Sequence, residues 1–346
     1  MQVVGYRIHE WGKPLHWDRF DLPPPGPGEA LVRLEACGIG LTVLNYIGGQ
    51  LADDPDLLPR VPGHELIGRV EAVGEGVREV EIGQRVMAYF YLAWGHCYAC
   101  RAGMDSRCER LAGWVGVHRD GGYAQYTVLP ARNLLPVPES IPAPLATAIP
   151  DAIATPLHVC KTRARVRPGD RVVVIGAGGG VGIHMVQMAR LFGGDVVGLE
   201  VNPDKFPTIE EAGGRAVLSA EFQHLDAAAW WNGRLPTVII DLVGNPTTLS
   251  WAATSLDTGG RMVVLTTFKG VDFPLSPRLW VFREATLLGS RYASKAELLE
   301  AAQLVASGRI RPVVTQIVPP QEVERVHEAI RQGTLIGRGA IDWTAG

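Results

Sequence analysis

A glycine-rich turn is the part of the sequence with the clearest chemical pattern. It follows the apolar run Arg171–Ile175, typical of a buried parallel strand, and precedes Val181–Phe192, whose apolar spacing predicts a helix. Glycine at such a junction lets the backbone approach a pyrophosphate, whose negative charge the helix N-terminus then stabilises. The residues that we expect to bind a dinucleotide here are Gly176, Gly179, Gly180, Val181 and Gly182.

An acidic residue ends the next predicted strand, Asp195–Glu200. Glu200 lies 24 residues after Gly176, where a carboxylate can accept a hydrogen bond from the ribose 2′-hydroxyl. It would also repel the 2′-phosphate of NADP, and neither of the next two residues is basic. We therefore predict NAD as the cofactor. The alternative is a glycine turn without a ligand, followed by a solvated glutamate.

Three of the five cysteines, Cys97, Cys100 and Cys108, lie close together with a spacing typical of a metal site. An odd number of cysteines in a chain of this size argues against a disulfide scaffold. The N-terminus lacks the pattern of a signal peptide, and no apolar run approaches the roughly 20 residues that span a bilayer. These features indicate a cytoplasmic protein that is not in a membrane.

The elements that must position these residues change character along the chain. The first 145 or so residues contain many short β-type runs, such as Ala30–Ala36 and Gly68–Val73, separated by Gly and Pro turns. Strands then alternate with helices, which predicts a doubly wound α/β domain. The last 50 residues begin with a predicted helix, Ser294–Ser307, and return to short strands. We predict a β-rich domain at 1–148, completed by 292–346, and a Rossmann domain at 149–291.

The bulk composition agrees with two globular domains. The chain has 346 residues, of which 47% are hydrophobic and 20% are charged. The formal net charge of −3 gives no reason to expect a nucleic-acid partner or an anionic membrane surface. A small-molecule substrate is the expected partner.

Several motifs occur in one collinear order along the whole chain. They are Pro62–Glu65, Gly121–Tyr126, Pro168–Val172 and the glycine turn. In this set the sequence resembles the zinc-type alcohol dehydrogenases of the medium-chain dehydrogenase/reductase family. The resemblance implies that the β-rich domain is GroES-like, that substrate and nicotinamide meet in a cleft between the domains, and that the protein is a homodimer or homotetramer formed through the Rossmann domains.

The resemblance also implies a catalytic zinc, but the chain departs from the family pattern at that site. His64 matches one zinc ligand and Asp151 aligns with another. The third ligand, a cysteine in the family, is replaced by Gly40, which has no donor atom. Glu65 could complete a His64–Glu65–Asp151 set, because a carboxylate is an acceptable zinc ligand. The alternatives are a metal-free cleft histidine and a plain loop acid.

Other positions follow the family pattern only in part. Thr42 matches a hydroxyl that passes on the substrate proton, whereas Asn45 stands where many relatives have a relay histidine. Arg338 looks like the basic residue that reaches the pyrophosphate. In the lobe that binds a structural zinc in relatives, the three cysteines are kept, but Trp94 replaces the first ligand. A fourth ligand from His96, Asp105 or water would be needed, and the alternative is a metal-free lobe.

Three functions remain compatible with the sequence. The first is NAD(H)-dependent interconversion of an alcohol and a ketone or aldehyde, with Thr42, His64, Glu65 and Asp151 acting at the substrate oxygen. The second is zinc-independent NAD(P)H reduction of activated C=C bonds, which the changes at positions 40 and 45 favour, because a conjugated enone needs only modest polarisation. The third is a non-catalytic cofactor-binding relative.

Overall fold

In the computed structural model the chain divides into two units of different architecture. The structure describes residues 1–50, 52–266 and 271–345. Unit 1 consists of Met1–Asp151, Ala293–Gly308 and Pro312–Gly346, and unit 2 consists of Ala152–Tyr292 and Arg309–Arg311. Within the described ranges no helix has both the length and the apolar character that crossing a bilayer requires.

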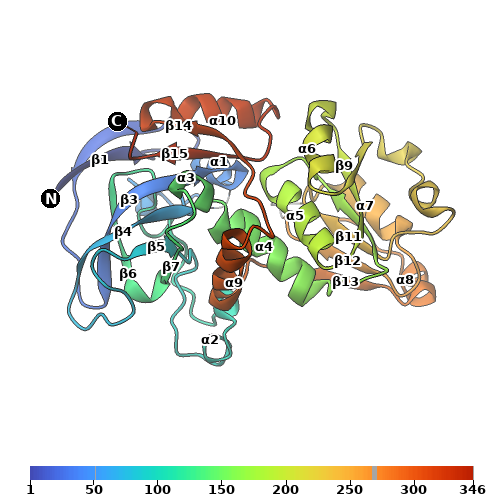
Figure 1. Ribbon diagram of the computed structural model, residues 1–346, viewed down its shortest axis with the longest axis horizontal. Helices are drawn as coiled ribbons and strands as arrows, with labels where there is room; N and C mark the ends of the chain where they lie inside the picture. Colours follow the sequence, from blue (N-terminus) through green and yellow to red (C-terminus); the bar gives the residue numbers. More distant parts are fainter. Residues whose placement is uncertain (51, 267–270, 346) are drawn as a thin grey trace. The chain divides into compact units, whose positions relative to one another are not determined.

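A mostly antiparallel seven-stranded sheet forms the centre of unit 1 (Figure 1). Its strand order is β14-β15-β3-β4-β5-β7, and β6 pairs with β3 on the edge that β15 also uses. The central strand β3 is the longest and is buried along almost its whole length, because apolar and small residues occupy both of its faces. The strand bounds are β3 Glu29–Ile39, β4 Leu66–Val73, β5 Arg85–Ala88, β6 Tyr126–Pro130, β7 Leu134–Pro136, β14 Val314–Val318 and β15 Arg338–Asp342.

In the described part of unit 1, a hairpin and five α-helices accompany the sheet. The helix α9 begins after a capping box, in which the Ser294 hydroxyl accepts from the Glu297 N–H and the Glu297 carboxylate accepts from the Ser294 N–H. The bounds are β1 Gln2–Arg7, β2 His16–Asp21, α1 Leu41–Ile47, α2 Tyr98–Arg101, α3 Ala143–Ala146, α9 Lys295–Ala306 and α10 Val323–Arg331.

Unit 2 contains a parallel sheet of six strands in the order β10-β9-β8-β11-β12-β13. Numbered within the unit, this is the 3-2-1-4-5-6 strand order of a dinucleotide-binding fold. The order in which successive strands are added to the sheet reverses between β8 and β11, although all the strands remain parallel. The central strand β8 is completely buried, as its continuous apolar run requires. The predicted doubly wound α/β class is therefore confirmed. The bounds are β8 Arg171–Ile175, β9 Asp195–Glu200, β10 Arg215–Leu218, β11 Val238–Asp241, β12 Arg261–Val264 and β13 Thr286–Gly289.

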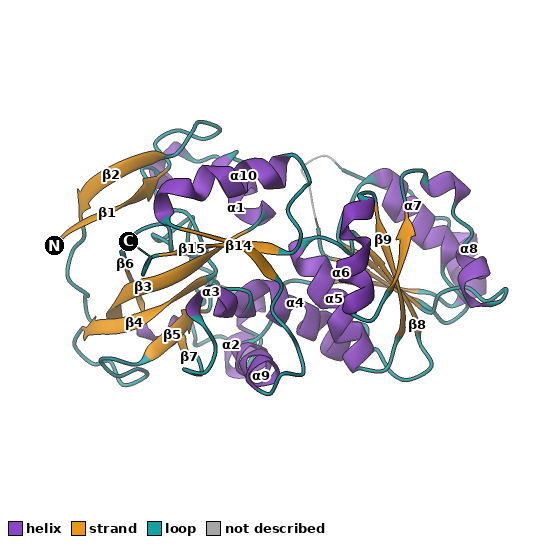
Figure 2. Ribbon diagram, turned by 45° about the horizontal axis from the view of Figure 1, so that its top comes forward, coloured by secondary structure: helices purple, strands orange, loops and turns teal. Residues whose placement is uncertain are grey.

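Helices cover both faces of this sheet (Figure 2). Two of them have side-chain caps: the Asn245 amide oxygen accepts from the Thr248 N–H at the start of α7, and Ser276 caps α8. The segment before β8 includes two π-helical stretches, η4 Ile149–Ile153 and η5 His158–Arg163. The α-helices are α4 Ala154–Leu157, α5 Gly180–Leu191, α6 Phe206–Glu211, α7 Pro246–Ser255 and α8 Pro277–Arg283.

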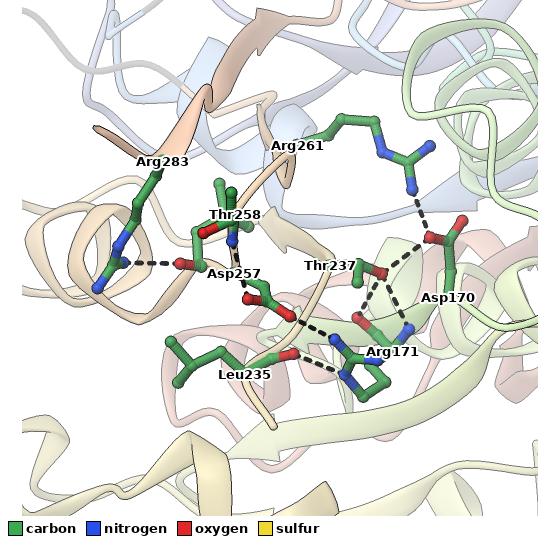
Figure 3. Close-up of polar contacts among 9 residues, drawn as sticks. Asp170, Arg171, Leu235, Thr237, Asp257, Thr258, Arg261 and Arg283 are labelled. Atoms are coloured by element: carbon green, nitrogen blue, oxygen red, sulfur yellow. Dashed lines mark hydrogen bonds and ion pairs between the residues drawn. The ribbon is translucent and has the colours of Figure 1, made fainter. Parts of the chain in front are cut away.

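A polar network joins the amino ends of three neighbouring strands of unit 2 (Figure 3). The Asp170 carboxylate accepts from the Thr237 hydroxyl at 2.8 Å and from the Arg261 guanidinium at 2.5 Å. Arg171 donates to the Asp257 carboxylate at 2.6 Å. Because Asp170, Thr237 and Arg261 lie at the starts of β8, β11 and β12, these bonds fix that edge of the sheet. The opposite, carboxyl edge is left for binding.

Candidate functional site

The glycine turn between β8 and α5 has the geometry of a phosphate-binding loop. Gly176 has a φ of +81°, which residues with a side chain rarely adopt. A Cβ at Gly182 would overlap the carbonyl oxygen of Gly176, so the turn can close only around glycine. Gly179, the N-cap of α5, has no side chain that could accept from the first N–H groups of the helix. These groups are thus available for a phosphate, and the residues present fit a dinucleotide.

Glu200 lies directly beside this turn and is buried, with 6% of its surface exposed. One carboxylate oxygen accepts from the Gly178 N–H at 2.9 Å, and the other accepts from the N–H groups of Val201 at 2.9 Å and Asn202 at 3.1 Å. A carboxylate has about four lone-pair sites, so it can still accept from a hydroxyl. The structure therefore brings Glu200 and the glycine turn together, and ribose binding by Glu200 stays a prediction.

Lys205 is a candidate binding residue that the sequence reasoning missed. It is 8% exposed, and a Cβ at Gly178 would lie 2.7 Å from its Cβ and Cδ atoms, so its side chain packs on the turn. The Asn202 side chain accepts from the Asp204 N–H and shapes the short helix η6, Pro203–Lys205, that brings the lysine back. The ammonium group can donate to ribose or phosphate oxygens. A lysine shortly after the acid was the only available signal in the sequence.

In unit 1 the structure brings together two of the predicted catalytic residues, His64 and Asp151. The His64 Nε2 atom lies 3.4 Å from an Asp151 carboxylate oxygen. The imidazole is fully buried and lies against the rings of Phe90 and Tyr46, with centroid distances of 4.7 and 5.9 Å. Burial, with the neighbouring Tyr91 and Asp151 charges, raises the pKa of the Tyr46 hydroxyl. An imidazole beside a carboxylate can take part in proton transfer as a general acid or base.

Glu65 does not join this pair. Its carboxylate forms an ion pair with the guanidinium of Arg338, and the Glu65 and Arg338 side chains are 0% and 6% exposed. The anticipated His64–Glu65–Asp151 set is therefore not assembled, because Arg338 holds the carboxylate elsewhere. A Cβ at Gly40 would overlap the same guanidinium, so the place of the missing cysteine is filled by a cation. These residues do not fit a catalytic zinc.

Two further predicted residues lie near Gly40. Thr42 is half-buried in the first turn of α1, which begins directly after Gly40. Arg338 is the first residue of β15, and its partner in the structure is Glu65 rather than an exposed group. A contact of Arg338 with the pyrophosphate, and a proton-passing role of Thr42, stay predictions.

The three cysteines form a compact group at the helix α2. Among the described residues, only Cys97, Cys100 and Cys108 form a set of three metal-ligating side chains with donor atoms within 4.8 Å of one another. The Sγ atom of Cys97 lies 3.4 Å from that of Cys100 and 3.9 Å from that of Cys108. Tetrahedral zinc with Zn–S distances of about 2.3 Å sets its sulfur atoms about 3.8 Å apart. The group therefore fits a zinc ion.

The surroundings favour the thiolate at Cys97, whereas burial raises the pKa of Cys100 to about 12, and among the described residues no fourth metal-ligating side chain joins the three. Backbone N–H groups, first that of Cys100, lower the pKa of Cys97 to about 7. The Trp94 N–H donates to the Cys108 sulfur at 3.2 Å, while the indole is 38% exposed and lies under the guanidinium of Arg110. Asp105, one suggested fourth ligand, is instead paired with Lys295 at 3.4 Å. Water is then the simplest fourth ligand.

Comparisons with known proteins agree along most of the chain. Residues 26–139 match the family model "Alcohol dehydrogenase GroES-like domain", and residues 180–307 match "Zinc-binding dehydrogenase". An alcohol dehydrogenase from Moraxella sp. (strain TAE123) is 31% identical, covering 97% of this chain and 98% of its own. An acryloyl-coenzyme A reductase from Metallosphaera sedula is 28% identical over 98% of each chain. The solved structure of a thermostable alcohol dehydrogenase from Pyrobaculum aerophilum superposes with a TM-score of 0.89, at 28% identity, over 99% of this chain and 100% of that one.

Proposed function

We propose that this chain interconverts an alcohol and a ketone or aldehyde with NAD(H), since it belongs to the zinc-type alcohol dehydrogenases of the medium-chain dehydrogenase/reductase family. The predicted family, enzyme class and NAD cofactor are confirmed. The observation that carries the proposal is the glycine turn of unit 2 with Glu200 buried against it. This arrangement binds a dinucleotide and disfavours a 2′-phosphate.

The bound cofactor supplies the hydride donor or acceptor. The residues of the chain then have two tasks. Gly176, Gly182 and the N-terminus of α5 hold the pyrophosphate, while Glu200 and Lys205 hold the ribose. Oxidation of an alcohol also releases the hydroxyl proton, and we assign its acceptance to the His64–Asp151 pair, in which the carboxylate can stabilise a protonated imidazole.

Steady-state assays of purified protein test this function. NADH oxidation is followed with a panel of ketones and aldehydes, and NAD⁺ reduction with the matching alcohols. We expect turnover with NADH well above turnover with NADPH, and loss of most kcat in His64→Ala. A panel of C=O substrates without turnover, with NADH binding intact, would contradict the proposal.

One observation favours a second candidate, reduction of an activated C=C bond. The guanidinium of Arg338 fills the space beside Gly40, and the predicted ligand set for a catalytic zinc is not assembled. A conjugated substrate needs less polarisation at its oxygen than an isolated ketone. The Metallosphaera sedula relative is named as a reductase of such a substrate. Pairs of saturated and α,β-unsaturated ketones, with product analysis, separate the two reactions.

We also propose one zinc ion in the cysteine group, held by Cys97, Cys100 and Cys108 with water as the fourth ligand. Metal analysis of Cys100→Ser against the parent protein tests this site.

None of the five cysteines, all of which lie in the described ranges, forms a disulfide, and this supports a cytoplasmic location.

The oligomeric state that we propose is a homodimer through unit 2. The strand β13 has a free edge in the sheet, and the preceding helix α8 exposes Val281 by 72% and Phe282 by 71%. An unpaired edge beside exposed apolar side chains favours pairing with a second copy. Light scattering after size exclusion should give twice the chain mass, and Phe282→Glu should shift the protein to monomer.

A further inference from the structure

Three neighbouring strands place four residues on one face of the unit 1 sheet. The registers pair Gly339 with Ile39 across β15 and β3, and Cys37 with Leu66 across β3 and β4. One step further, Arg338 lies opposite Gly40, and Glu65 lies opposite Gly38. Since side chains two residues apart along a strand share a face, all four positions lie on the same side of the sheet.

The two glycines make room for the ion pair between Arg338 and Glu65. A Cβ at Gly38 would lie 2.7 Å from a Glu65 carboxylate oxygen, and a Cβ at Gly40 would overlap the Arg338 guanidinium. The pair therefore spans β3 through space that side chains at 38 and 40 would occupy. A cysteine at position 40 and the observed position of Arg338 exclude each other.

The two charges depend on each other, because both are removed from water. Glu65 is 0% and the Arg338 side chain 6% exposed. Among the described residues, neither carboxylate oxygen of Glu65, nor Nε or the ion-paired terminal nitrogen of Arg338, has any further hydrogen-bond partner. The guanidinium and the carboxylate therefore offset each other's charge inside the protein.

We propose that Arg338, which Glu65 holds in the space beside Gly40, prevents zinc from binding at His64 and Asp151. Position 40 offers no donor atom, the nearby carboxylate of Glu65 is already paired, and the guanidinium fills the space that a metal-binding side chain at position 40 would need. The inference concerns metal occupancy and does not depend on the substrate proposed above.

Metal binding tests the exclusion in the full-length Cys100→Ser protein, which removes the signal of the cysteine group. The protein is incubated with ZnCl₂ or CoCl₂, desalted and analysed for bound metal and for the visible absorption of tetrahedral cobalt. We expect no bound metal in Cys100→Ser or in Cys100→Ser with Gly40→Cys. Adding Arg338→Ala to the latter should give about one metal ion per chain, lost again in Asp151→Ala.

Metal bound by Cys100→Ser itself and lost in His64→Ala would overturn the proposal. So would metal gained by Gly40→Cys while Arg338 is intact. Both of these outcomes can be observed even if the variant that lacks Arg338 does not fold.

Thermal unfolding tests the steric part without any metal. We expect Gly40→Ala to lower the unfolding temperature. Adding Arg338→Ala to this variant should lower the temperature much less than Arg338→Ala does in the parent protein, because both substitutions disturb the same ion pair. Gly26→Ala is the matched control, since a Cβ there meets only the end of the flexible Glu29 side chain. Additive effects, or a Gly40→Ala protein as stable as the parent, would contradict the overlap.

Discussion

The cysteine group at α2 and the site around Gly40 each lack one cysteine of the family pattern, but different groups occupy the two positions. At the cysteine group the replacement, Trp94, turns its indole outward, and its backbone N–H donates to Cys108. The guanidinium of Arg110 lies over the indole ring. At Gly40 a buried guanidinium fills the vacant volume. We therefore expect the group that occupies the space of a lost ligand to affect metal binding more than the number of ligands left.

The same difference appears in the electrostatics of the two regions. N–H donors around Cys97 favour the thiolate, which is the form that binds zinc. Beside Gly40 lies the Arg338 guanidinium, and it is paired with Glu65, one of the two carboxylates that a metal could otherwise have used. The cysteine group therefore offers a thiolate at Cys97 to a metal ion, whereas the site around Gly40 already contains the positive charge of Arg338.

The largest expected effect comes from removing one half of the buried ion pair. Glu65→Ala should destabilise unit 1 by about 3–5 kcal/mol, because it leaves the Arg338 charge buried and uncompensated. Hydrogen exchange of the β3 and β15 amides measures this loss within unit 1. The control is Glu211→Ala, whose ion pair with Arg311 is 2.9 Å long but more than 60% exposed on both sides, and should cost at most about 1 kcal/mol. Equal effects of the two variants would show that burial does not make the Glu65–Arg338 pair more important for stability than an exposed ion pair.

Removal of zinc from the cysteine group should have the next largest effect. If the metal is present at about 100 times its Kd, chelation should cost about 2.7 kcal/mol of local stability. Residues 92–113 should then become sensitive to trypsin, which can cleave after Arg101, Arg107 and Arg110. Cys160→Ala, which alters a buried cysteine of unit 2, is the control and should keep its zinc. Unchanged proteolysis after complete zinc removal would show that the lobe is stable without metal.

The cofactor turn serves as the intact reference, since no expected residue has been lost there. Glu200→Ala should weaken NADH binding by about 1.5–3 kcal/mol and raise the relative activity with NADPH, while zinc content stays constant. The KM values for both cofactors measure the change. Glu210→Ala, an exposed acid on the nearby helix α6, should behave like the parent protein. A Glu200→Ala enzyme with unaltered cofactor preference would argue against the ribose contact.

The smallest expected effect gives the sharpest comparison. Trp94→Cys restores a fourth thiolate where nothing blocks it, so zinc should pass to a competing chelator about tenfold more slowly, equivalent to ~1.4 kcal/mol. Trp94→Ala, which removes the indole without adding a ligand, should show no such gain. Gly40→Cys should also gain nothing, despite restoring a family cysteine. The reverse outcome, a gain at position 40 and none at 94, would invert the comparison.

Local patterns predicted unit 2 well. The strand β8, the glycine turn and the helix α5 lie within one residue of their expected bounds, because each depends on neighbours in the sequence. The β10 strand, Arg215–Leu218, was not predicted, since it is short, partly exposed and has no clear alternation. In unit 1 the expected runs Ala30–Ala36 and Gly68–Val73 lie within β3 and β4.

The parts of the site that sequence reasoning did not reach depend on long-range pairing. Glu65 and Arg338 are separated by most of the chain, and only the registers of β4 and β15 against β3 bring them together. Gly40 could be recognised as a missing ligand but not as space for a guanidinium. Lys205 was missed because its contact also depends on the folded backbone: the turn capped by Asn202 places its side chain against Gly178.

The pairing of β15 with the end of β3 has a consequence for synthesis of the chain. Roughly 300 residues separate Ile39 from its neighbour across the sheet, so a ribosome adding about 5–20 residues per second needs about 15–60 s to supply the missing strand. Unit 2 is made almost entirely during this interval. Until then the nascent β3 has an uncovered edge at residues 36–39, and Glu65 has no counter-ion. We therefore expect the risk of wrong strand pairing to be greatest between translation of the first and last strands.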